Sequence, residues 1–290
     1  MPPSLLSTLA GLLIAITIVV GFVMLVVHLG FRAPRVRESG DPGQIGAAFD
    51  TVSIPSVDGK RLFGWFLRGE RSDTTVIILH GWGVNAEMML PLARPFQHAG
   101  LHVLLFDTRN HGRSDSGGHS SLPRFAEDLD HAIAWLRRSY PVQSRRVVLL
   151  GHSVGAGAVL LSASRRDDID AVIAVSAFAH PRLMMRRFLK PRRVPDWMIR
   201  LILRYVQWII GHDYEDIAPV NTVCTIRCPI LLVHGRADRT VPVSDALAID
   251  RGCPGAAIEL LLIDGADHES VERIDAHGDV LVRFALGEAA

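Results

Sequence analysis

A serine hydroxyl attacks a carbonyl group when a base removes its proton, and one serine of this chain lies in a setting suited to that role. Gly151-His152-Ser153-Val154-Gly155 follows the apolar run 147–150 and precedes a run of small residues, 156–163. These runs predict a strand, a sharp turn and a helix, which is the setting of a nucleophile elbow. Ser153 is therefore the predicted nucleophile. The alternative is a glycine-rich turn that has no catalytic role.

A serine nucleophile needs a base, and the base needs an acid that orients it. His268 follows the predicted strand 258–263, and Asp238 follows the preceding predicted strand, 230–233. Sites in open α/β sheets form at the carboxyl ends of the strands. We therefore expect both side chains to lie close to Ser153, with His268 as the base and Asp238 as the acid.

Other residues compete for these two roles. Asp264 and Asp267 are rival acids because both are close to His268 in the sequence. Asp238 is preferred because it follows a separate strand and can approach the imidazole from behind. His111 is a rival base, but it precedes the serine and lacks a suitable acid partner.

The negative charge that develops on a substrate oxygen requires hydrogen-bond donors. The predicted strand 76–79 ends in His80-Gly81-Trp82-Gly83, a flexible loop that can aim a backbone N–H at this oxygen. We expect the N–H groups of Trp82 and Val154 to be the donors. The Trp82 ring is expected either to form a wall of the acyl pocket or only to pack the loop. In a further loop, Asp107 and Arg109 are expected to pair.

These motifs resemble those of the α/β-hydrolase superfamily over roughly residues 49–286. The matching residues are His80-Gly81-Trp82-Gly83, Asp107-x-Arg109-x-x-Gly112-x-Ser114, Gly151-x-Ser153-x-Gly155, Asp238 and His268. Within the superfamily the chain is similar to membrane-tethered serine hydrolases of the ABHD type and to bacterial α/β-fold esterases. The resemblance implies an α/β-hydrolase fold and a Ser-His-Asp triad, and it implies no particular substrate.

The order of apolar and polar segments predicts the same architecture. Residues 50–55 and 61–68 read as a hairpin, after which strands and helices alternate, ending in a helix over 271–286. This alternation predicts a mostly parallel central sheet with helices on both faces. Residues 178–221 interrupt it with arginines and large apolar side chains, which indicates a helical cap. The alternative is a helix packed on the sheet with a solvated arginine face.

The beginning of the chain predicts a membrane segment. Residues 1–31 contain no Asp, Glu, Lys or Arg, and residues 5–29 are mostly Leu, Ile and Val. As a helix, this stretch would extend roughly 37 Å, enough to cross a bilayer. We expect an uncleaved transmembrane helix at 5–29, a linker at 32–48, and the hydrolase domain at 49–290.

Two other structures could account for this apolar run. A cleaved signal peptide would need a basic leading segment, a shorter apolar core and a small-residue cleavage site. A buried core helix would need a second large apolar surface to cover it. Arg32, Arg35 and Arg37 follow the span with no basic side chain before it, which predicts a single-pass protein with its domain in the cytoplasm.

The composition narrows the function. Lys and Arg number 31 against 30 Asp and Glu, which gives no basic footprint for nucleic acid. We expect a membrane-anchored serine hydrolase that cleaves ester, thioester or related acyl bonds of a small-molecule or lipid-like substrate, without a cofactor or metal. The alternatives are a non-catalytic tethered binding protein and a peptidase or haloperoxidase of the same fold. The sequence predicts no oligomeric state.

Overall fold

The structure, a computed structural model of the chain, describes residues 5–70, 73–190 and 194–288. Its centre is an eight-stranded sheet in the order β1-β2-β4-β3-β5-β6-β7-β8. Only β1–β2 and β2–β4 pair in antiparallel fashion, and the other neighbours are parallel. The strands are β1 (Phe49–Pro55), β2 (Arg61–Leu67), β3 (Thr74–Leu79), β4 (His102–Phe106), β5 (Arg146–His152), β6 (Ala171–Val175), β7 (Ile230–Gly235) and β8 (Ile258–Ile263).

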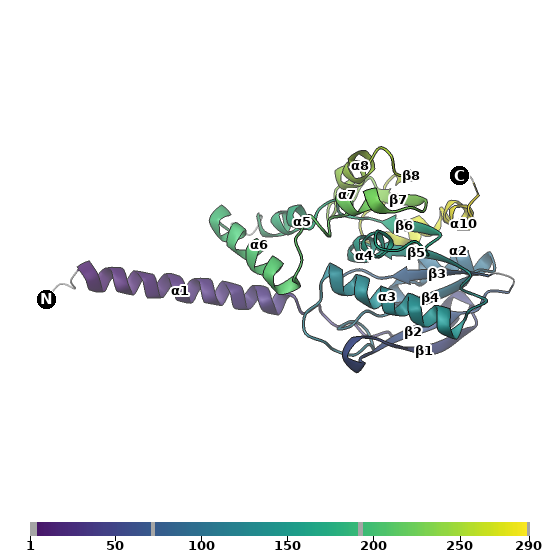
Figure 1. The fold of residues 1–290 in the computed structure, drawn as a ribbon, viewed down its shortest axis with the longest axis horizontal. Helices are drawn as coiled ribbons and strands as arrows, with labels where there is room; N and C mark the ends of the chain where they lie inside the picture. Colours follow the sequence, from purple (N-terminus) through teal and green to yellow (C-terminus); the bar gives the residue numbers. More distant parts are fainter. Residues whose placement is uncertain (1–4, 71–72, 191–193, 289–290) are drawn as a thin grey trace.

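Helices cover both faces of this sheet, because the central strands are apolar on both sides (Figure 1). Alternate residues of β3 point to opposite cores: Ile77 and Leu79 to one, Val76 and Ile78 to the other. The predicted mostly parallel sheet between two helical layers is confirmed. The first core includes side chains of α3 (Leu122–Ser139), α4 (Val154–Ala163) and α8 (Val243–Gly252), and the second those of α2 (Leu90–His98), α9 (Val271–Asp275) and α10 (Gly278–Leu286).

The single helix expected over 271–286 is divided into α9 and α10. The break lets the backbone of Gly278 pack against α2, where a Cβ on this glycine would lie 2.5 Å from the Cβ of Pro95. A continuous helix with a larger residue at this position could not approach α2 as closely. The close contact between α2 and the start of α10 therefore accounts for the break between α9 and α10.

Residues between β6 and β7 form α5 (Pro181–Leu189), α6 (Asp196–Ile210) and α7 (Pro219–Thr222). The expected cap, 178–221, includes residues 191–193, which lie outside the described residues. One face of α6 is buried in a small apolar cluster of its own. That cluster also contains side chains from the last two turns of α1 (Leu5–Gly30), so α6 lies beside the end of α1 (Figure 1).

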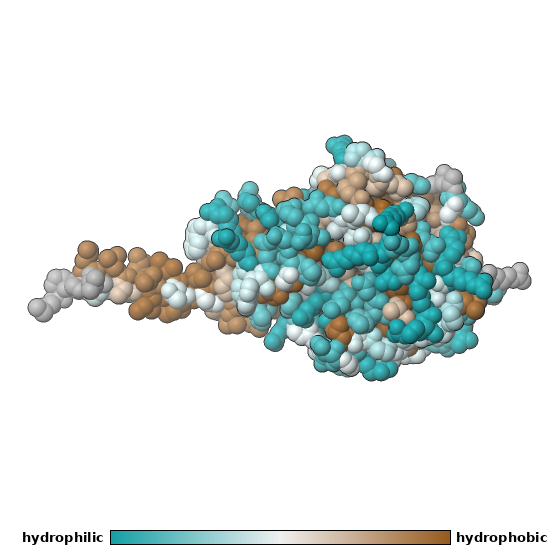
Figure 2. Space-filling model, viewed as in Figure 1, coloured by the Kyte–Doolittle hydropathy of each residue, from teal (hydrophilic) through white to brown (hydrophobic). Residues whose placement is uncertain are grey.

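The helix α1 extends away from the rest of the molecule, and its surface is apolar (Figure 2). Residues Ser7–Gly30 are long and apolar enough to cross a bilayer, and none of the most apolar window is buried. A signal sequence would meet the same criteria of length and composition. Most of α1 is therefore exposed, and only its last turns pack against α6.

The segment expected as a linker, 32–48, lies against the domain. Arg35 Nη1 donates to the carbonyl oxygens of Gly112 at 3.2 Å and Ser114 at 2.7 Å. Directly before this segment, the Phe31 carbonyl oxygen accepts the Ser120 N–H at 2.9 Å. These bonds fix the end of α1 relative to the sheet.

Candidate active site

Ser153 occupies the turn between β5 and α4 with a left-handed backbone, φ 56° and ψ −115°. Its N–H donates to the Val175 carbonyl oxygen at 2.9 Å. The two glycines of the motif are required by space: a Cβ on Gly151 would lie 2.3 Å from the Gly155 oxygen, and one on Gly155 would lie 2.4 Å from the Leu79 oxygen. The close approach of these segments holds the serine at the tip of the turn.

The structure brings the three predicted triad residues together. His268 Nε2 lies 3.0 Å from Ser153 Oγ, and His268 Nδ1 lies 2.7 Å from Asp238 Oδ2. The serine comes from the end of β5, the aspartate from the loop after β7, and the histidine from the loop after β8. Because these strands are parallel neighbours or near neighbours, their carboxyl ends meet at one edge of the sheet.

The Asp238 carboxylate is buried and fully engaged. Its Oδ1 accepts the N–H groups of Thr240 at 2.9 Å and Val241 at 2.8 Å. Burial alone would raise the pKa of Asp238, but the hydrogen bonds from His268 and Val241 bring it below its ordinary value. The group is therefore held as an anion beside the imidazole.

The rival residues lie elsewhere. Asp264 pairs with Arg236 Nε at 2.9 Å, and its side chain is 90% exposed. Asp267 accepts the Ser270 hydroxyl. His111 is buried, where its Nδ1 lies 3.1 Å from the Arg109 carbonyl oxygen, and burial lowers its pKa to about 4.

The expected pairing of Asp107 with Arg109 is wrong. Arg109 instead binds the buried Asp128, with 2.9 Å between Nη2 and Oδ1. Asp107 accepts the N–H groups of Ala86 at 2.8 Å and Arg113 at 2.9 Å. The two side chains therefore have separate roles: Arg109 ties the loop to Asp128 of α3, and Asp107 binds two backbone N–H groups.

Sequence reasoning missed His152, which lies directly beneath the triad. Its Nε2 is 2.9 Å from the carbonyl oxygen of His268. Burial, followed by the nearby His268, lowers the pKa of His152 to about 4, so the ring is neutral and donates this bond. It fixes the backbone that carries the proposed base. Its place inside the Gly-x-Ser-x-Gly motif was the available signal.

The loop after β3 passes beside the serine. A Cβ on Gly81 would lie 3.3 Å from the Ser153 Cβ, so the Gly81–Trp82 peptide is next to the nucleophile. Val154 is the first residue of α4, where an N–H has no intrahelical acceptor. The Gly81–Trp82 peptide and the first turn of α4 therefore lie on either side of Ser153 in the chain's fold, and the role of their N–H groups stays a prediction.

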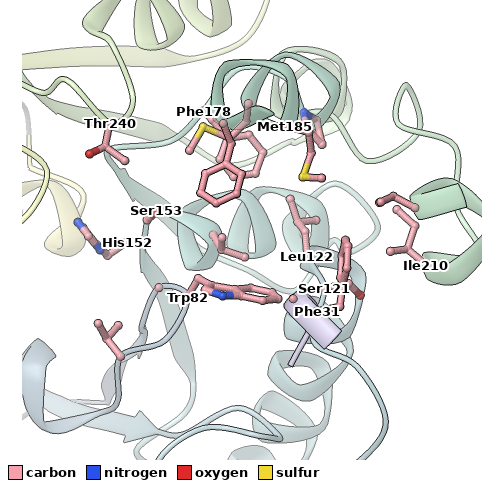
Figure 3. A pocket seen from close by; sticks show the side chains of 18 of the residues that line it. Phe31, Trp82, Ser121, Leu122, His152, Ser153, Phe178, Met185, Ile210 and Thr240 are labelled. Atoms are coloured by element: carbon pink, nitrogen blue, oxygen red, sulfur yellow. The ribbon is translucent and has the colours of Figure 1, made fainter. Parts of the chain in front are cut away.

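An apolar cavity of about 670 Å³ opens beside Ser153 and His268. Figure 3 shows Ser153, His152 and Thr240 on one side of it and Ile210 on the other, with the rings of Trp82 and Phe178 between them. The loop after β3, α3, the insertion and the end of α1 all supply its walls. Among the described lining residues, Glu269 is the single acidic side chain, and it is exposed.

Comparisons with known proteins agree with this fold. The family model described as serine aminopeptidase, S33, matches residues 70–220. The esterase Pf2001 of Pyrococcus furiosus superposes with a TM-score of 0.71 at 26% identity, covering 88% of this chain and 96% of the esterase. Its fold is therefore shared over nearly its whole length.

Two relatives by sequence cover most of the chain. The uncharacterized protein YfhR of Escherichia coli O157:H7 is 28% identical over 248 residues, which are 82% of this chain and 80% of YfhR. The uncharacterized membrane protein YNL320W of Saccharomyces cerevisiae is 24% identical over 247 residues, 84% of this chain and 82% of its own.

Proposed function

Because this chain belongs to the serine aminopeptidase S33 family of α/β-hydrolases, we propose that it is a membrane-anchored serine hydrolase of carboxylic ester or thioester bonds. The single observation that carries the proposal is the pair of contacts of His268, at 3.0 Å to Ser153 Oγ and 2.7 Å to Asp238 Oδ2. This arrangement gives the imidazole a hydroxyl to deprotonate and a carboxylate that stabilises the resulting positive charge.

In the proposed first half-reaction, Ser153 Oγ attacks the carbonyl carbon of the substrate while its proton passes to His268 Nε2. The carbonyl electron pair moves to the oxygen, which accepts hydrogen bonds from the N–H groups of Trp82 and Val154. The tetrahedral intermediate then collapses. Its bond to the leaving group breaks, the leaving group takes the proton from His268, and the acyl group stays on Ser153.

Water completes the proposed cycle. His268 takes a proton from the water, whose oxygen attacks the acyl carbon, and the bond from this carbon to Ser153 Oγ breaks. The serine oxygen recovers the proton from His268, and the carboxylic acid leaves. The Asp238 carboxylate stays ionised throughout and holds the tautomer with the proton on Nδ1.

The cavity favours an acyl ester over a peptide. An aminopeptidase binds a charged amino terminus, which requires carboxylates that face the cavity. Among the lining residues that the structure describes, Glu269 alone is acidic, and it is exposed. The similarity to an esterase points in the same direction. The apolar, unburied helix α1 supports the membrane anchor, with residues 5–29 as its span.

The nucleophile is tested with the full chain in detergent micelles. Ser153→Ala should lower kcat on 4-methylumbelliferyl butyrate by roughly 10⁶ and abolish labelling by a fluorophosphonate. Ser121→Ala is the matched control, since it removes another buried serine of the same cavity. Labelling that survives in folded Ser153→Ala would refute the assignment, and faster turnover of aminoacyl anilides than of esters would favour the peptidase.

The same assay tests the acid. Asp238→Asn should lower kcat by on the order of 10⁴, because the amide no longer holds the imidazole in the required tautomer. Asp264→Asn changes an exposed carboxylate near His268 and should leave kcat within about twofold of the parent protein. A larger loss of kcat in Asp264→Asn than in Asp238→Asn would show that Asp264, and not Asp238, orients His268.

A further inference from the structure

The cavity beside Ser153 has a wall that comes from the apolar amino-terminal helix. Val26, Val27, Gly30 and Phe31, at the end of α1, line the same cavity as Ser153 and His268. The end of α1 is fixed there by the Phe31 carbonyl oxygen, which accepts the Ser120 N–H at 2.9 Å. The helix is therefore part of the pocket as well as an extension of the chain.

The helix α6 supplies a further wall at this end of the cavity. Its residues Ile202, Val206 and Ile210 line the cavity. Its buried face also packs with α1 in one apolar cluster, which includes Val23 and Val27. The far end of the cavity thus lies where α6 meets the last two turns of α1.

The outer surface of the insertion suits the surface of a bilayer. Trp208 is 77% exposed and Trp197 is 50% exposed, and both belong to α6. Tryptophan gathers at membrane–water interfaces, where its ring is buried and its N–H stays hydrated. The exposed Arg200 and Arg204 of the same helix can contact anionic headgroups. Since α6 packs on the end of α1, a bilayer that holds α1 would meet these side chains.

The lining matches an unbranched hydrocarbon chain. Leu122, Phe178 and Met185 lie between the serine and the α1–α6 end, and Met184 also lines the cavity. Methionine adapts to irregular apolar shapes, and hydroxyl groups of a polar substrate would find few partners there. The volume of about 670 Å³ lies within the range of pockets that enclose whole ligands.

From these observations we infer that the substrate is an acyl lipid of the membrane that holds α1, and that its acyl chain lies between α1 and α6 with its ester at Ser153. The inference rests on the proposed function and names the substrate class. The lipid enters sideways from the bilayer, because the wall of the cavity at that end is the membrane helix itself. The reaction is the acyl transfer to Ser153 and then to water already described.

The first experiment blocks the α1 wall of the full chain in lipid nanodiscs. Val27→Trp places a large ring in the cavity, and Leu25→Trp is the matched control because Leu25 is 53% exposed on α1 and does not line the cavity. The readout is the ratio of kcat/KM for 4-methylumbelliferyl palmitate to that for the butyrate. Each buried methylene contributes a factor of about four, so Val27→Trp should lower the ratio tenfold or more, and Leu25→Trp should leave it unchanged. Equal ratios in the two variants would overturn the inference.

The second experiment detects the chain without turnover. Folded Ser153→Ala is placed in vesicles that contain phosphatidylcholine with a diazirine in one acyl chain, and crosslinked peptides are identified by mass spectrometry. Crosslinks to Met184 or Met185 that disappear in the double variant with Val27→Trp support the channel. Crosslinks confined to the lipid-facing residues of α1 would overturn it.

The two experiments separate the channel from the catalytic proposal. Crosslinks in the cavity without ester turnover by the parent protein would support lipid binding and refute the serine hydrolase. Butyrate turnover without cavity crosslinks, and with an unchanged ratio in Val27→Trp, would keep the hydrolase and refute the channel. Palmitate ester that is cleaved equally fast from the enzyme's own nanodisc and from separate vesicles would refute entry from the bilayer.

Discussion

At the scale of single residues, burial distinguishes the two aspartates that could orient His268. Asp238 is buried and accepts two backbone N–H groups, which keeps its pKa below the ordinary value despite desolvation. Asp264 is solvated and pairs with Arg236. A solvated carboxylate stabilises a protonated imidazole only weakly, because water and salt screen its charge. The buried group is therefore the stronger candidate for orienting the base.

His80, at the end of β3, gives the fold a dependence on pH. Its Nδ1 donates to the Gly81 carbonyl oxygen at 2.7 Å, and its Nε2 accepts the Thr108 N–H at 3.0 Å. Burial, followed by the nearby His111, lowers the pKa of His80 to about 3. A proton on Nε2 would meet the Thr108 N–H, so the folded protein keeps this ring neutral.

The first prediction at this scale concerns His80→Gln, which keeps an acceptor and cannot titrate. The unfolded chain binds a proton at His80 below pH about 6.5 and the folded chain does not, so the free energy of unfolding falls as pH decreases. Between pH 7 and pH 5 the parent protein should lose about 2 kcal/mol more than His80→Gln. Urea unfolding of the full chain in micelles, followed by tryptophan fluorescence, measures both. Equal losses would show that His80 takes up a proton in the folded state.

The residues that the sequence could locate are those whose roles depend on chain order. Ser153, Asp238 and His268 follow strands and share an edge of the sheet, so their positions can be read from apolar runs. The contact of His152 with the His268 carbonyl and the choice of Asp128 as the partner of Arg109 depend on which elements pack together. Such contacts have no local pattern in the sequence.

At the scale of elements, the turn between β5 and α4 depends on its contact with β3. The strands could be predicted because buried parallel strands are continuous apolar runs. The division of α9 from α10 could not, because the close approach of Gly278 to Pro95 is a tertiary contact. The same kind of contact fixes the nucleophile, since Gly155 lies against the backbone of Leu79 and His80.

Gly155→Ala is therefore expected to damage both stability and activity. Its Cβ would lie 2.4 Å from the Leu79 oxygen and 2.5 Å from the His80 oxygen, and neither backbone group can move without shifting β3. We expect a loss of about 3 kcal/mol, which corresponds to a Tm lower by roughly 5–10 °C, and a loss of esterase activity.

Gly157→Ala provides the control on the same helix. Its Cβ would meet the Leu122 Cδ1, the end of a flexible side chain, and alanine is the better helix former by about 1 kcal/mol. It should keep the parent Tm within about 3 °C. Thermal unfolding and butyrate turnover of both variants decide the matter. Full activity and stability in Gly155→Ala would mean that β3 and α4 are not in close contact.

At the scale of the whole molecule, α1 is both a candidate membrane span and a wall of the cavity. The sequence indicates the first of these properties and not the second. The uncharged run predicts a span, but nothing in the sequence indicates that its end forms a wall of the cavity. That role comes from the packing of α1 on α6 and from the segment 32–48, which Arg35 ties to the domain. The proposed anchor and the proposed catalytic centre are therefore held in one fixed arrangement.

The last prediction concerns this arrangement in cells. If residues 5–29 are an uncleaved span, the full chain should stay in the membrane after washing with high salt or alkaline carbonate, and its first residues should be present in the mature protein.

The basic Arg32, Arg35 and Arg37 follow the span, so the domain should face the cytoplasm. Protease added to intact bacterial cells that express the chain should leave the domain whole, and permeabilised cells serve as the control for its susceptibility. A mature chain that begins near Phe31 would identify an export signal. Digestion of the domain in intact cells would show that the domain lies outside the cell. The lipid substrate would then come from the outer leaflet of the same membrane.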